Sequence, residues 1–374
     1  MAETAIAVET VAERLARTVT PLINAGGANT EKSGSRMRPE ALAAMNGAVE
    51  SFFSINELLD AAGEMVVDLI DAQNGQVPNL QAACICAGAA TGMSLMASAT
   101  LTRGKSYRRA SLPNTDGFPN ELVAQRSHSI NYDQSWQTTG AKLIFAGREE
   151  GCTAEEFEAA IGPDTCGLIF LAEKSGTLGL EELVAIGAAR DLPVIVDAAS
   201  VLGGAEARWR LTKYLAAGAD MVCFKGGAGI RGPQSTGLVL GKADYILDCR
   251  LNAFPNQAVM RAAKVCKEEI FGLVAAVEGF MAEDDSALTA HDAARMQRIV
   301  DAVADIPGID SSVIDKEDGS GPKALINLRP SDGWSGPEAA PILEQLLDQP
   351  KPGHPRLFCG AKIAFFAMPF DTRY

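Results

Sequence analysis

Short apolar runs alternate with amphipathic stretches through the middle of the chain. Runs of strand length occupy residues 82–86, 122–126, 142–146, 166–172, 193–197, 221–224 and 237–240. Stretches of helical length lie between them, over residues 89–99, 180–190 and 211–217, and Thr153 with Glu156 forms a capping box that opens one more helix. Strands that alternate with crossover helices predict an α/β fold, in which a mostly parallel sheet carries helices on both faces.

The two flanks depart from this alternation. Residues 1–45 contain a glycine-rich loop and are expected to form an N-terminal arm, and residues 46–250 hold the strand–helix alternation. After Asn252 a long helical stretch precedes strand-like segments at 324–328 and 356–366. We therefore expect a small α+β C-terminal domain over residues 251–374.

Composition and charge exclude several classes of function. The 374 residues carry 33 Lys and Arg against 47 Asp and Glu, a formal net charge of −14. Such a surface repels phosphate backbones, so we expect no nucleic-acid partner. The first residues lack the basic segment and apolar core of a signal peptide, and the apolar runs are too short to span a bilayer, so no membrane partner is expected. The eight cysteines form no CxxC pair, which predicts no metal site and a reducing, cytoplasmic setting.

Two strand ends carry candidate chemistry. In Cys86-Ala87-Gly88-Ala89-Ala90-Thr91-Gly92, small residues lead from a strand into a helix, where exposed N–H groups suit a phosphate. Tight packing of helix on strand explains the same small residues. Asp197 ends the apolar run Val194-Ile195-Val196, where a buried acid calls for a cationic partner, although capping of the following turn is an equal alternative.

A third strand end holds a lysine in a glycine-rich segment. Phe224-Lys225-Gly226-Gly227-Ala228-Gly229-Ile230-Arg231 follows an apolar strand and leads to Gly232-Pro233-Gln234-Ser235-Thr236-Gly237. A lysine here can form a Schiff base with an aldehyde cofactor, and glycines let the backbone approach that cofactor closely. The alternative is a plain glycine-rich turn with a solvated lysine. Phosphate loop, acid and lysine follow one another in the order typical of pyridoxal-phosphate (PLP) enzymes of fold type I, whereas the full GxGxxG of a nicotinamide site is absent.

The sequence resembles the selenocysteine-synthase-like branch of fold type I, in particular its short members, typified by D-glucosaminate-6-phosphate ammonia lyase. The likeness covers roughly residues 20–250. It is carried by Ile23-Asn24-Ala25-Gly26-Gly27, Asn56-Glu57-Leu58 with Ala62-Gly63, Cys86-Ala87-Gly88-Ala89-Ala90, Gln125-Arg126-Ser127-His128, Val196-Asp197-Ala198-Ala199 and Gly232-Pro233-Gln234. The resemblance makes residues 46–250 the cofactor-binding domain and PLP the cofactor.

The resemblance also implies roles for individual residues. Backbone N–H groups of Ala87, Gly88 and Ala89 would hold the cofactor phosphate, and Asp197 would pair with the pyridine nitrogen. His128 would stack on the ring, against the alternative of a surface or capping histidine. Further cofactor contacts are implied for Gln234, Ser235 and Thr236, of the same or a neighbouring subunit. The candidates for an anionic substrate group, against the alternative of solvated charge, are Arg36, Arg38 and Arg356.

The chain departs from the family pattern at the lysine. The family places its lysine four residues after the phenylalanine and before Gly-Pro-Gln; here Ala228 occupies that position and Lys225 occupies the family's serine position. Three explanations stay open: an engineered lysine-to-alanine replacement at Ala228, transfer of the role to Lys225, or a natural homologue without Schiff-base chemistry.

The leading hypothesis from the sequence is a PLP-dependent lyase of the ammonia-lyase or dehydratase type. It would act on a small amino acid or amino sugar acid by Schiff base and Cα deprotonation. A racemase or epimerase of the same fold shares the first step, and a PLP-fold protein that binds ligand without catalysis is an alternative of another class. Selenium transfer on tRNA is disfavoured by the negative charge. Fold type I sites are shared between subunits, which implies a homodimer or a larger homo-oligomer.

Overall fold

The protein divides into two compact units. The computed structural model describes residues 10–19, 21–172, 174, 176–203, 206–306, 309–315, 322–328, 356–358 and 367–370. Among the described residues, one unit comprises those of 34–288, and the other comprises those of 1–33, 289–316 and 321–374. The domain boundaries expected from the sequence stay a prediction.

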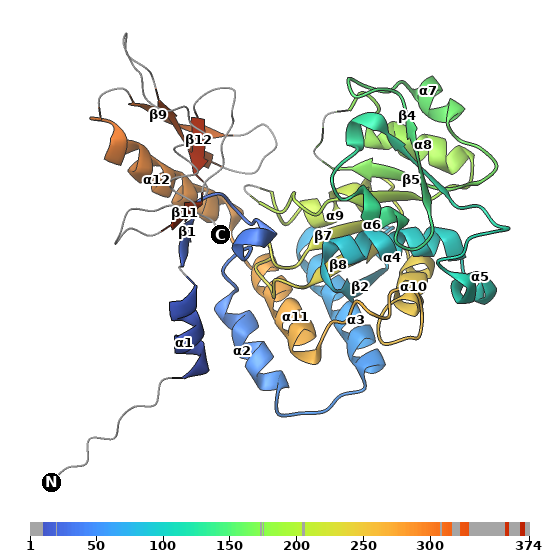
Figure 1. The fold of residues 1–374 in the computed structure, drawn as a ribbon, viewed down its shortest axis with the longest axis horizontal. Helices are drawn as coiled ribbons and strands as arrows, with labels where there is room; N and C mark the ends of the chain where they lie inside the picture. The colour runs from blue at the N-terminus through green and yellow to red at the C-terminus, as the bar shows by residue number, and fades with distance from the viewer. Residues whose placement is uncertain are drawn as a thin grey trace. The chain divides into compact units, whose positions relative to one another are not determined.

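A seven-stranded sheet forms the centre of the larger unit (Figure 1). Its strand order is β2-β8-β7-β6-β5-β3-β4, and β8 alone among these strands runs antiparallel to its two neighbours. The strands are β2 (Ala82–Cys86), β3 (Glu121–Gln125), β4 (Lys142–Ala146), β5 (Thr165–Leu171), β6 (Val194–Asp197), β7 (Met221–Lys225) and β8 (Gly237–Gly241). The α/β fold with a mostly parallel sheet is confirmed.

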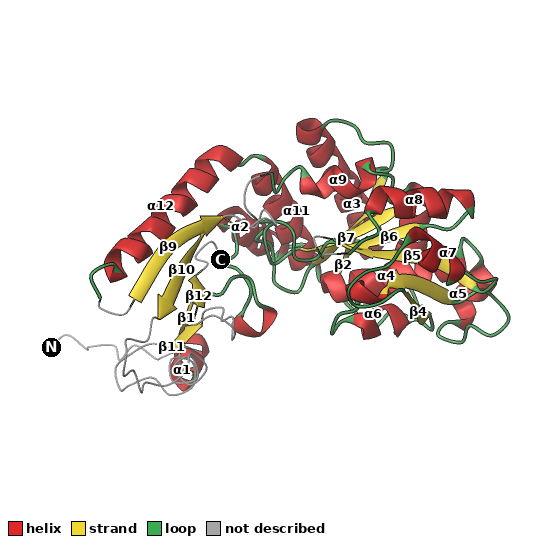
Figure 2. Ribbon diagram, turned by 90° about the horizontal axis from the view of Figure 1, so that it is seen from above, coloured by secondary structure: helices red, strands yellow, loops and turns green. Residues whose placement is uncertain are grey.

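Helices cover both faces of this sheet, as Figure 2 shows. On one face the core includes residues of α3 (Ile55–Asn74), α7 (Ala154–Ala159), α8 (Leu180–Ala189), α9 (Arg210–Ala216) and α11 (Lys267–Met281), with α2 (Pro39–Ala48) packed on α11. The core of the other face includes residues of α4 (Gly88–Thr102), α6 (Asp133–Gln137) and α10 (Ala243–Asn252). The short helices α5 (Ser106–Ser111) and η2 (Arg126–His128) complete the described elements of this unit.

Side-chain alternation along the strands decides which groups reach the α4 face. Val222 and Phe224 of β7 belong to the core of the α3 face, whereas Met221 and Cys223 belong to the core of the α4 face. The period of two places Lys225, the last residue of β7, on the α4 face as well. In β6 the same alternation places Asp197 on that face, because Ile195 packs there.

The smaller unit brings distant parts of the chain together. Strand β1 (Leu22–Asn24) pairs in parallel with β11 (Arg356–Phe358), and an antiparallel sheet has the order β12-β10-β9. Its strands are β9 (Ile309–Asp315), β10 (Pro322–Leu328) and β12 (Ala367–Phe370). Helices α1 (Val11–Thr18), η1 (Thr30–Lys32) and most of α12 (Asp285–Val303) belong to this unit.

Most of the elements expected from the sequence lie within a few residues of their observed bounds. The capping box at Thr153 and Glu156 is present and begins α7. The strand expected at 122–126 ends one residue earlier, because Arg126 begins η2, and β7 extends one residue further than expected, to Lys225. The strand expected at 356–366 is described only as Arg356–Phe358, and the rest of that range lies outside the described residues.

Candidate active site

The start of α4 forms a cradle built from backbone. Ala87 caps the helix without a side-chain hydrogen bond, and Gly88 follows with a φ of +83°. The first N–H groups of a helix have no acceptor within the helix, so they face outward for an anion. Gly237 lies against this turn so closely that a Cβ there would be 2.4 Å from the carbonyl carbon of Gly88 and 2.8 Å from the nitrogen of Ala89. The cradle therefore requires glycine at both positions.

Asp197 is a buried carboxyl at the carboxyl end of β6. The side chain is 5% exposed, and its Oδ1 accepts a 2.9 Å hydrogen bond from the Ala199 N–H. Burial raises the pKa of Asp197, and the Ala199 N–H, the charge of Lys225 and the Cys223 thiol act in the opposite direction. A cationic group from a ligand would relieve the desolvation of this carboxylate.

Lys225 extends from the neighbouring strand toward the same place. Its Nζ donates to the Ser200 Oγ over 3.3 Å, and its charge acts on Asp197. In the sheet, Lys225 pairs with Gly237, which in turn pairs with Cys86, the residue just before the cradle. Glycine in the strand between them leaves no side chain separating the lysine from the start of α4. The structure thus brings lysine, acid and cradle to one end of three strands.

His128 lies at the end of β3, in η2. The ring is 4% exposed, meets Phe170 edge-on at 5.0 Å between centroids, and accepts a 3.2 Å hydrogen bond from the Leu171 N–H on its Nδ1. Burial first, and then the charge of Lys174, lower the pKa of His128 to about 4, with the Lys174 backbone acting against them. The His128 ring is therefore neutral at neutral pH. Because it is buried and lies within η2, His128 is neither a surface residue nor a helix-capping residue.

The residues after β7 have different surroundings. Thr236 is 1% exposed and its hydroxyl donates 2.7 Å to the Pro233 carbonyl, so that it closes a turn. Ser235 is exposed and donates to a Glu269 carboxylate oxygen, and Gln234 is exposed with its carboxamide against Gly34. Ala228 is half-buried, and its carbonyl accepts from the Arg231 N–H.

The three arginines considered for an anionic substrate group are not equivalent. Arg38 is 5% exposed, its Nε donates 2.8 Å to the Ile230 carbonyl, and its Nη2 is 2.7 Å from Glu283 Oε1. Arg36 is exposed. Arg356 belongs to the other unit and pairs through its backbone with Leu22, while its side chain lies outside the described part of the structure. Arg38 is thus committed to protein groups.

Comparisons with known proteins agree on the fold. No family model matches the chain. It is 29% identical over 306 residues to D-glucosaminate-6-phosphate ammonia lyase of Salmonella typhimurium, covering 80% of this chain and 77% of that protein. It is 26% identical over 339 residues to 5'-C-glycyluridine monooxygenase-decarboxylase of a Streptomyces species, covering 88% and 80%. A shorter match, 27% over 164 residues, covers 39% of the chain and 34% of L-seryl-tRNA(Sec) selenium transferase of Nitratidesulfovibrio vulgaris.

A solved structure of D-glucosaminate-6-phosphate ammonia-lyase superposes with a TM-score of 0.79 at 24% identity, covering 98% of this chain and 94% of that one. The chain is a homologue of PLP-dependent enzymes of fold type I. The resemblance drawn from the sequence motifs is confirmed, and so is the expectation of a PLP enzyme.

The residues at this site of the fold type I chain fit PLP. The cradle at Gly88 offers helix N–H groups and excludes side chains, which suits a phosphate. The buried carboxyl of Asp197, whose pKa is raised by burial, suits a protonated pyridine nitrogen. An amine is present at Lys225. The phosphate, the ring nitrogen and the aldehyde of PLP are thus matched by the cradle at Gly88, by Asp197 and by Lys225.

Sequence reasoning missed two residues that contact the candidate lysine and the candidate acid. Ser200, which accepts from Lys225, and Cys223, whose Sγ is 3.8 Å from Asp197 Oδ1, were not among the candidates. The strand period carried a usable signal for Cys223, because a residue two before Lys225 shares its face. Among the described residues there is no group of three or more His, Cys, Asp or Glu that could hold a metal ion, and no helix with the length and apolar character needed to cross a membrane.

Proposed function

We propose that this chain is a PLP-dependent lyase acting on a small amino acid or amino sugar acid. The observation that carries the proposal is the convergence of Lys225, Asp197 and the cradle at Gly88 on one edge of the sheet. The relative that eliminates ammonia, D-glucosaminate-6-phosphate ammonia lyase, supports the reaction class.

The proposed roles follow the chemistry of each group. The N–H groups of Ala87, Gly88 and Ala89 would hold the phosphate, Asp197 the pyridine nitrogen and Lys225 the aldehyde, with His128 beside the ring. When bound, PLP supplies an electron sink for the electrons of a bond to the substrate Cα. Asp197 keeps that sink effective, because its negative charge favours protonation of the ring nitrogen.

Lys225, rather than an absent lysine at position 228, is the amine we assign to the reaction. Its Nζ already lies beside Ser200 and acts on Asp197, on the α4 face of the sheet. In the proton step, the Lys225 amine would accept the proton from the substrate Cα. The electron pair of that C–H bond would form the double bond to the neighbouring carbon as its C–N or C–O bond breaks, and the departing group would take the electron pair of the broken bond and a proton, leaving as ammonia or water. Ser200 accepts a hydrogen bond from Nζ and so holds the amine in place.

The experiment is to locate the covalent attachment. The chain loaded with PLP is expected to show a visible absorbance band, and borohydride reduction followed by peptide mass analysis should place the adduct on Lys225. Lys225→Ala should abolish the adduct, whereas Lys174→Ala should keep it, because the Nζ of Lys174 donates to the Ser129 carbonyl.

A second set of variants separates the remaining explanations. If Lys225→Ala keeps the adduct, or if an adduct and activity arise only in Ala228→Lys, Lys225 is not the reactive amine. If neither the unaltered chain nor Ala228→Lys binds PLP, the proposal as a whole is wrong. Incubation with amino acids and amino sugar acids should release ammonia and a 2-oxo acid; inversion at Cα without release would identify a racemase instead.

We also propose that the chain forms a homodimer or a larger homo-oligomer. Four apolar side chains on α2 and the segment after it are exposed, and among them Phe52 is fully exposed: Leu42, Val49, Phe52 and Phe53. Gln234, Ser235 and Arg36 are exposed, which supports contact with a neighbouring subunit or a substrate. Light scattering at several protein concentrations tests the association state.

A reducing, cytoplasmic setting is part of the proposal. It is supported by the seven cysteines of the described residues, which are all free thiols, six of them buried. Fractionation of cells that express the tagged full chain tests the location.

A further inference from the structure

Residues 34–38, which we call the tether, lie along the loop that follows Lys225. The Ser35 N–H and Oγ both donate to the Gly227 carbonyl, over 3.3 Å and 2.8 Å. The Arg38 N–H donates 2.9 Å to the Arg231 carbonyl, and the Arg231 Nε donates 3.0 Å to the Arg36 carbonyl. Segments about 190 residues apart in sequence are thus joined by a row of hydrogen bonds.

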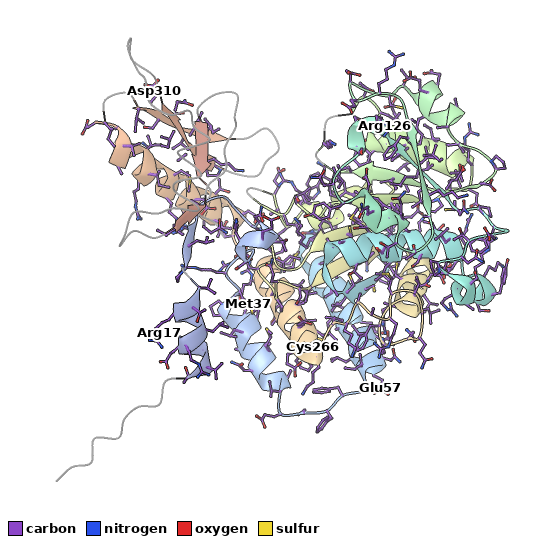
Figure 3. The ribbon with its side chains drawn as sticks, viewed as in Figure 1. Arg17, Met37, Glu57, Arg126, Cys266 and Asp310 are labelled. Atoms are coloured by element: carbon purple, nitrogen blue, oxygen red, sulfur yellow. The ribbon has the colours of Figure 1, made fainter. Side chains whose placement is uncertain are left out.

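The tether is itself fixed at a buried ion pair. The Arg38 guanidinium reaches the Ile230 carbonyl through Nε and Glu283 through Nη2, with Glu40 at 3.7 Å from Nη1. Met37, labelled in Figure 3, is packed against the core of the α3 face. The guanidinium is 5% exposed, so its partners hold it more firmly than exposed partners would. One end of the tether is therefore anchored to the rest of the unit through Arg38.

In the loop that follows Lys225, two positions have no space for a side chain that could restrict the backbone. A Cβ at Gly227 would be 2.5 Å from the Gln234 Cα, and one at Gly229 would be 1.6 Å from the Leu202 carbonyl oxygen. Both positions require glycine, and glycine loses more backbone freedom on ordering than any other residue. Hydrogen bonds within the loop supply part of its order, and the tether adds contacts from another segment at Gly227, Ile230 and Arg231.

We propose that the tether is a positioning device for the lysine-bearing loop, with Ser35 and Arg38 as its positioning residues. Arg38 acts through the loop backbone and does not meet the substrate. The tether fixes the backbone on both sides of Ala228 and the residues that follow Lys225. Its effect on Lys225 chemistry rests on the function proposed above, but its effect on loop order does not.

Hydrogen exchange in the cofactor-free full chain tests the tether. Three loop amides are protected by hydrogen bonds within the loop and therefore report its opening. The Gly226 N–H donates to the Thr236 carbonyl, the Arg231 N–H to the Ala228 carbonyl, and the Gly232 N–H to the Gly226 carbonyl. Ser35→Ala removes one of the two donors to Gly227, so these amides should exchange about fivefold faster, the size expected for one hydrogen bond. The Ala198 N–H, which bonds to the Cys223 carbonyl in the sheet, should be unchanged.

Arg36→Ala is the matched control. Arg36 takes part in the hydrogen bonds of the tether only through its backbone carbonyl, and its side chain is exposed. This variant should therefore leave the exchange rates of the loop amides unchanged. Arg38→Lys keeps the charge but loses the fork that reaches Ile230 and Glu283 together, and loop exchange should rise by more than in Ser35→Ala. Ser35→Ala alone decides the question if Arg38→Lys fails to fold.

Two results would overturn the proposal. One is loop exchange within twofold of the unaltered chain in Ser35→Ala, and the other is an Arg36→Ala effect as large as that of Ser35→Ala. In the loaded enzyme, Ser35→Ala should lower kcat while KM is kept, whereas a substrate-binding role for this segment would raise KM. Failure of the PLP adduct to form at Lys225 would leave the exchange result standing, so the two proposals fail separately.

Discussion

Burial shifts the pKa values of two ionisable side chains of the site, His128 and Asp197, toward their neutral forms. A neutral histidine can lie beside a positively charged ring without repelling it, and a carboxyl that is costly to ionise is ready for a cationic partner. Both effects have the same cause, removal of water, and both have consequences for stability that do not depend on activity.

The pKa of His128, lowered to about 4 from the ordinary 6.5, makes folding sensitive to acid. Between these values the unfolded chain binds a proton that the folded chain does not, so the free energy of unfolding falls as pH decreases through this window. The loss from this one residue should approach roughly 3 kcal/mol. Urea denaturation at both ends of the window, for the unaltered chain and for His128→Gln, measures it. An equal pH dependence in both proteins would contradict a neutral, buried ring.

Asp197 should be a source of instability when no cofactor is bound. Burial raises the pKa of Asp197, so the stability that the neutral carboxyl contributes at low pH is lost as pH rises through its pKa in the folded chain. Asp197→Asn keeps an acceptor for the Ala199 N–H and should stabilise the cofactor-free chain by about 1 kcal/mol while weakening PLP binding. Urea denaturation and cofactor titration measure the two effects.

Asp220 is the control for that substitution. Its carboxylate accepts from the Val194 N–H and from Lys242 at 2.7 and 2.6 Å, so Asp220→Asn should cost about 1–2 kcal/mol. If Asp197→Asn destabilises the cofactor-free chain as much as Asp220→Asn does, the carboxylate of Asp197 is not held at a cost.

At the scale of elements, strands were easier to predict than helices. Every strand of the large sheet was expected from a run of apolar residues, because a strand buried on both faces needs such a run. The long helix α3 was not singled out, although its buried apolar residues recur at helical spacing: Leu59, Ala62, Val66 and Ile70. The strand ends gave the candidate acid and lysine, but the role of Arg38 was not predictable, because its partners Ile230 and Glu283 are remote in sequence.

The contact between β8 and α4 leaves no room for a side chain at Gly237. Gly237→Ala would place a methyl group within 2.5 Å of backbone atoms of Gly88, which cannot move without opening the cradle. We expect a loss of about 2 kcal/mol or more in the free energy of unfolding and weaker binding of PLP. Thermal denaturation with and without PLP measures both.

Gly47→Ala supplies the comparison for that variant. Gly47 lies within α2 and a Cβ there meets nothing within 4 Å, so alanine should stabilise the chain by roughly 0.5–1 kcal/mol. A neutral Gly237→Ala, with the cofactor still bound, would show that the cradle tolerates a side chain.

At the scale of the whole molecule, ligand binding and folding are linked. The site is built from residues of β2, β6, β7, β8 and α4, so separation of these strands from one another would pull its residues apart. Bound PLP should therefore raise the free energy of unfolding by about 2.7 kcal/mol at a hundredfold excess over its dissociation constant.

Pyridoxine 5'-phosphate, which keeps the ring and the phosphate but lacks the aldehyde, separates the contributions. It should stabilise the unaltered chain less than PLP does, and in Lys225→Ala the two ligands should stabilise equally. Denaturation midpoints at matched ligand concentrations measure the difference. A persistent advantage of PLP in Lys225→Ala would place the aldehyde on another amine.

The row of hydrogen bonds between the tether and the loop also sets an order of assembly. Strands β7 and β8 are neighbours in sequence and pair as soon as the connection between them closes, whereas Ser35 and Arg38 must find carbonyls 192 residues further along the chain. Contacts between remote segments form late, because the intervening chain has to be ordered first. During synthesis on the ribosome the tether emerges long before its partners exist. We therefore expect the site of this protein to be completed at the end of folding, when residues 34–38 pair with the connection between β7 and β8.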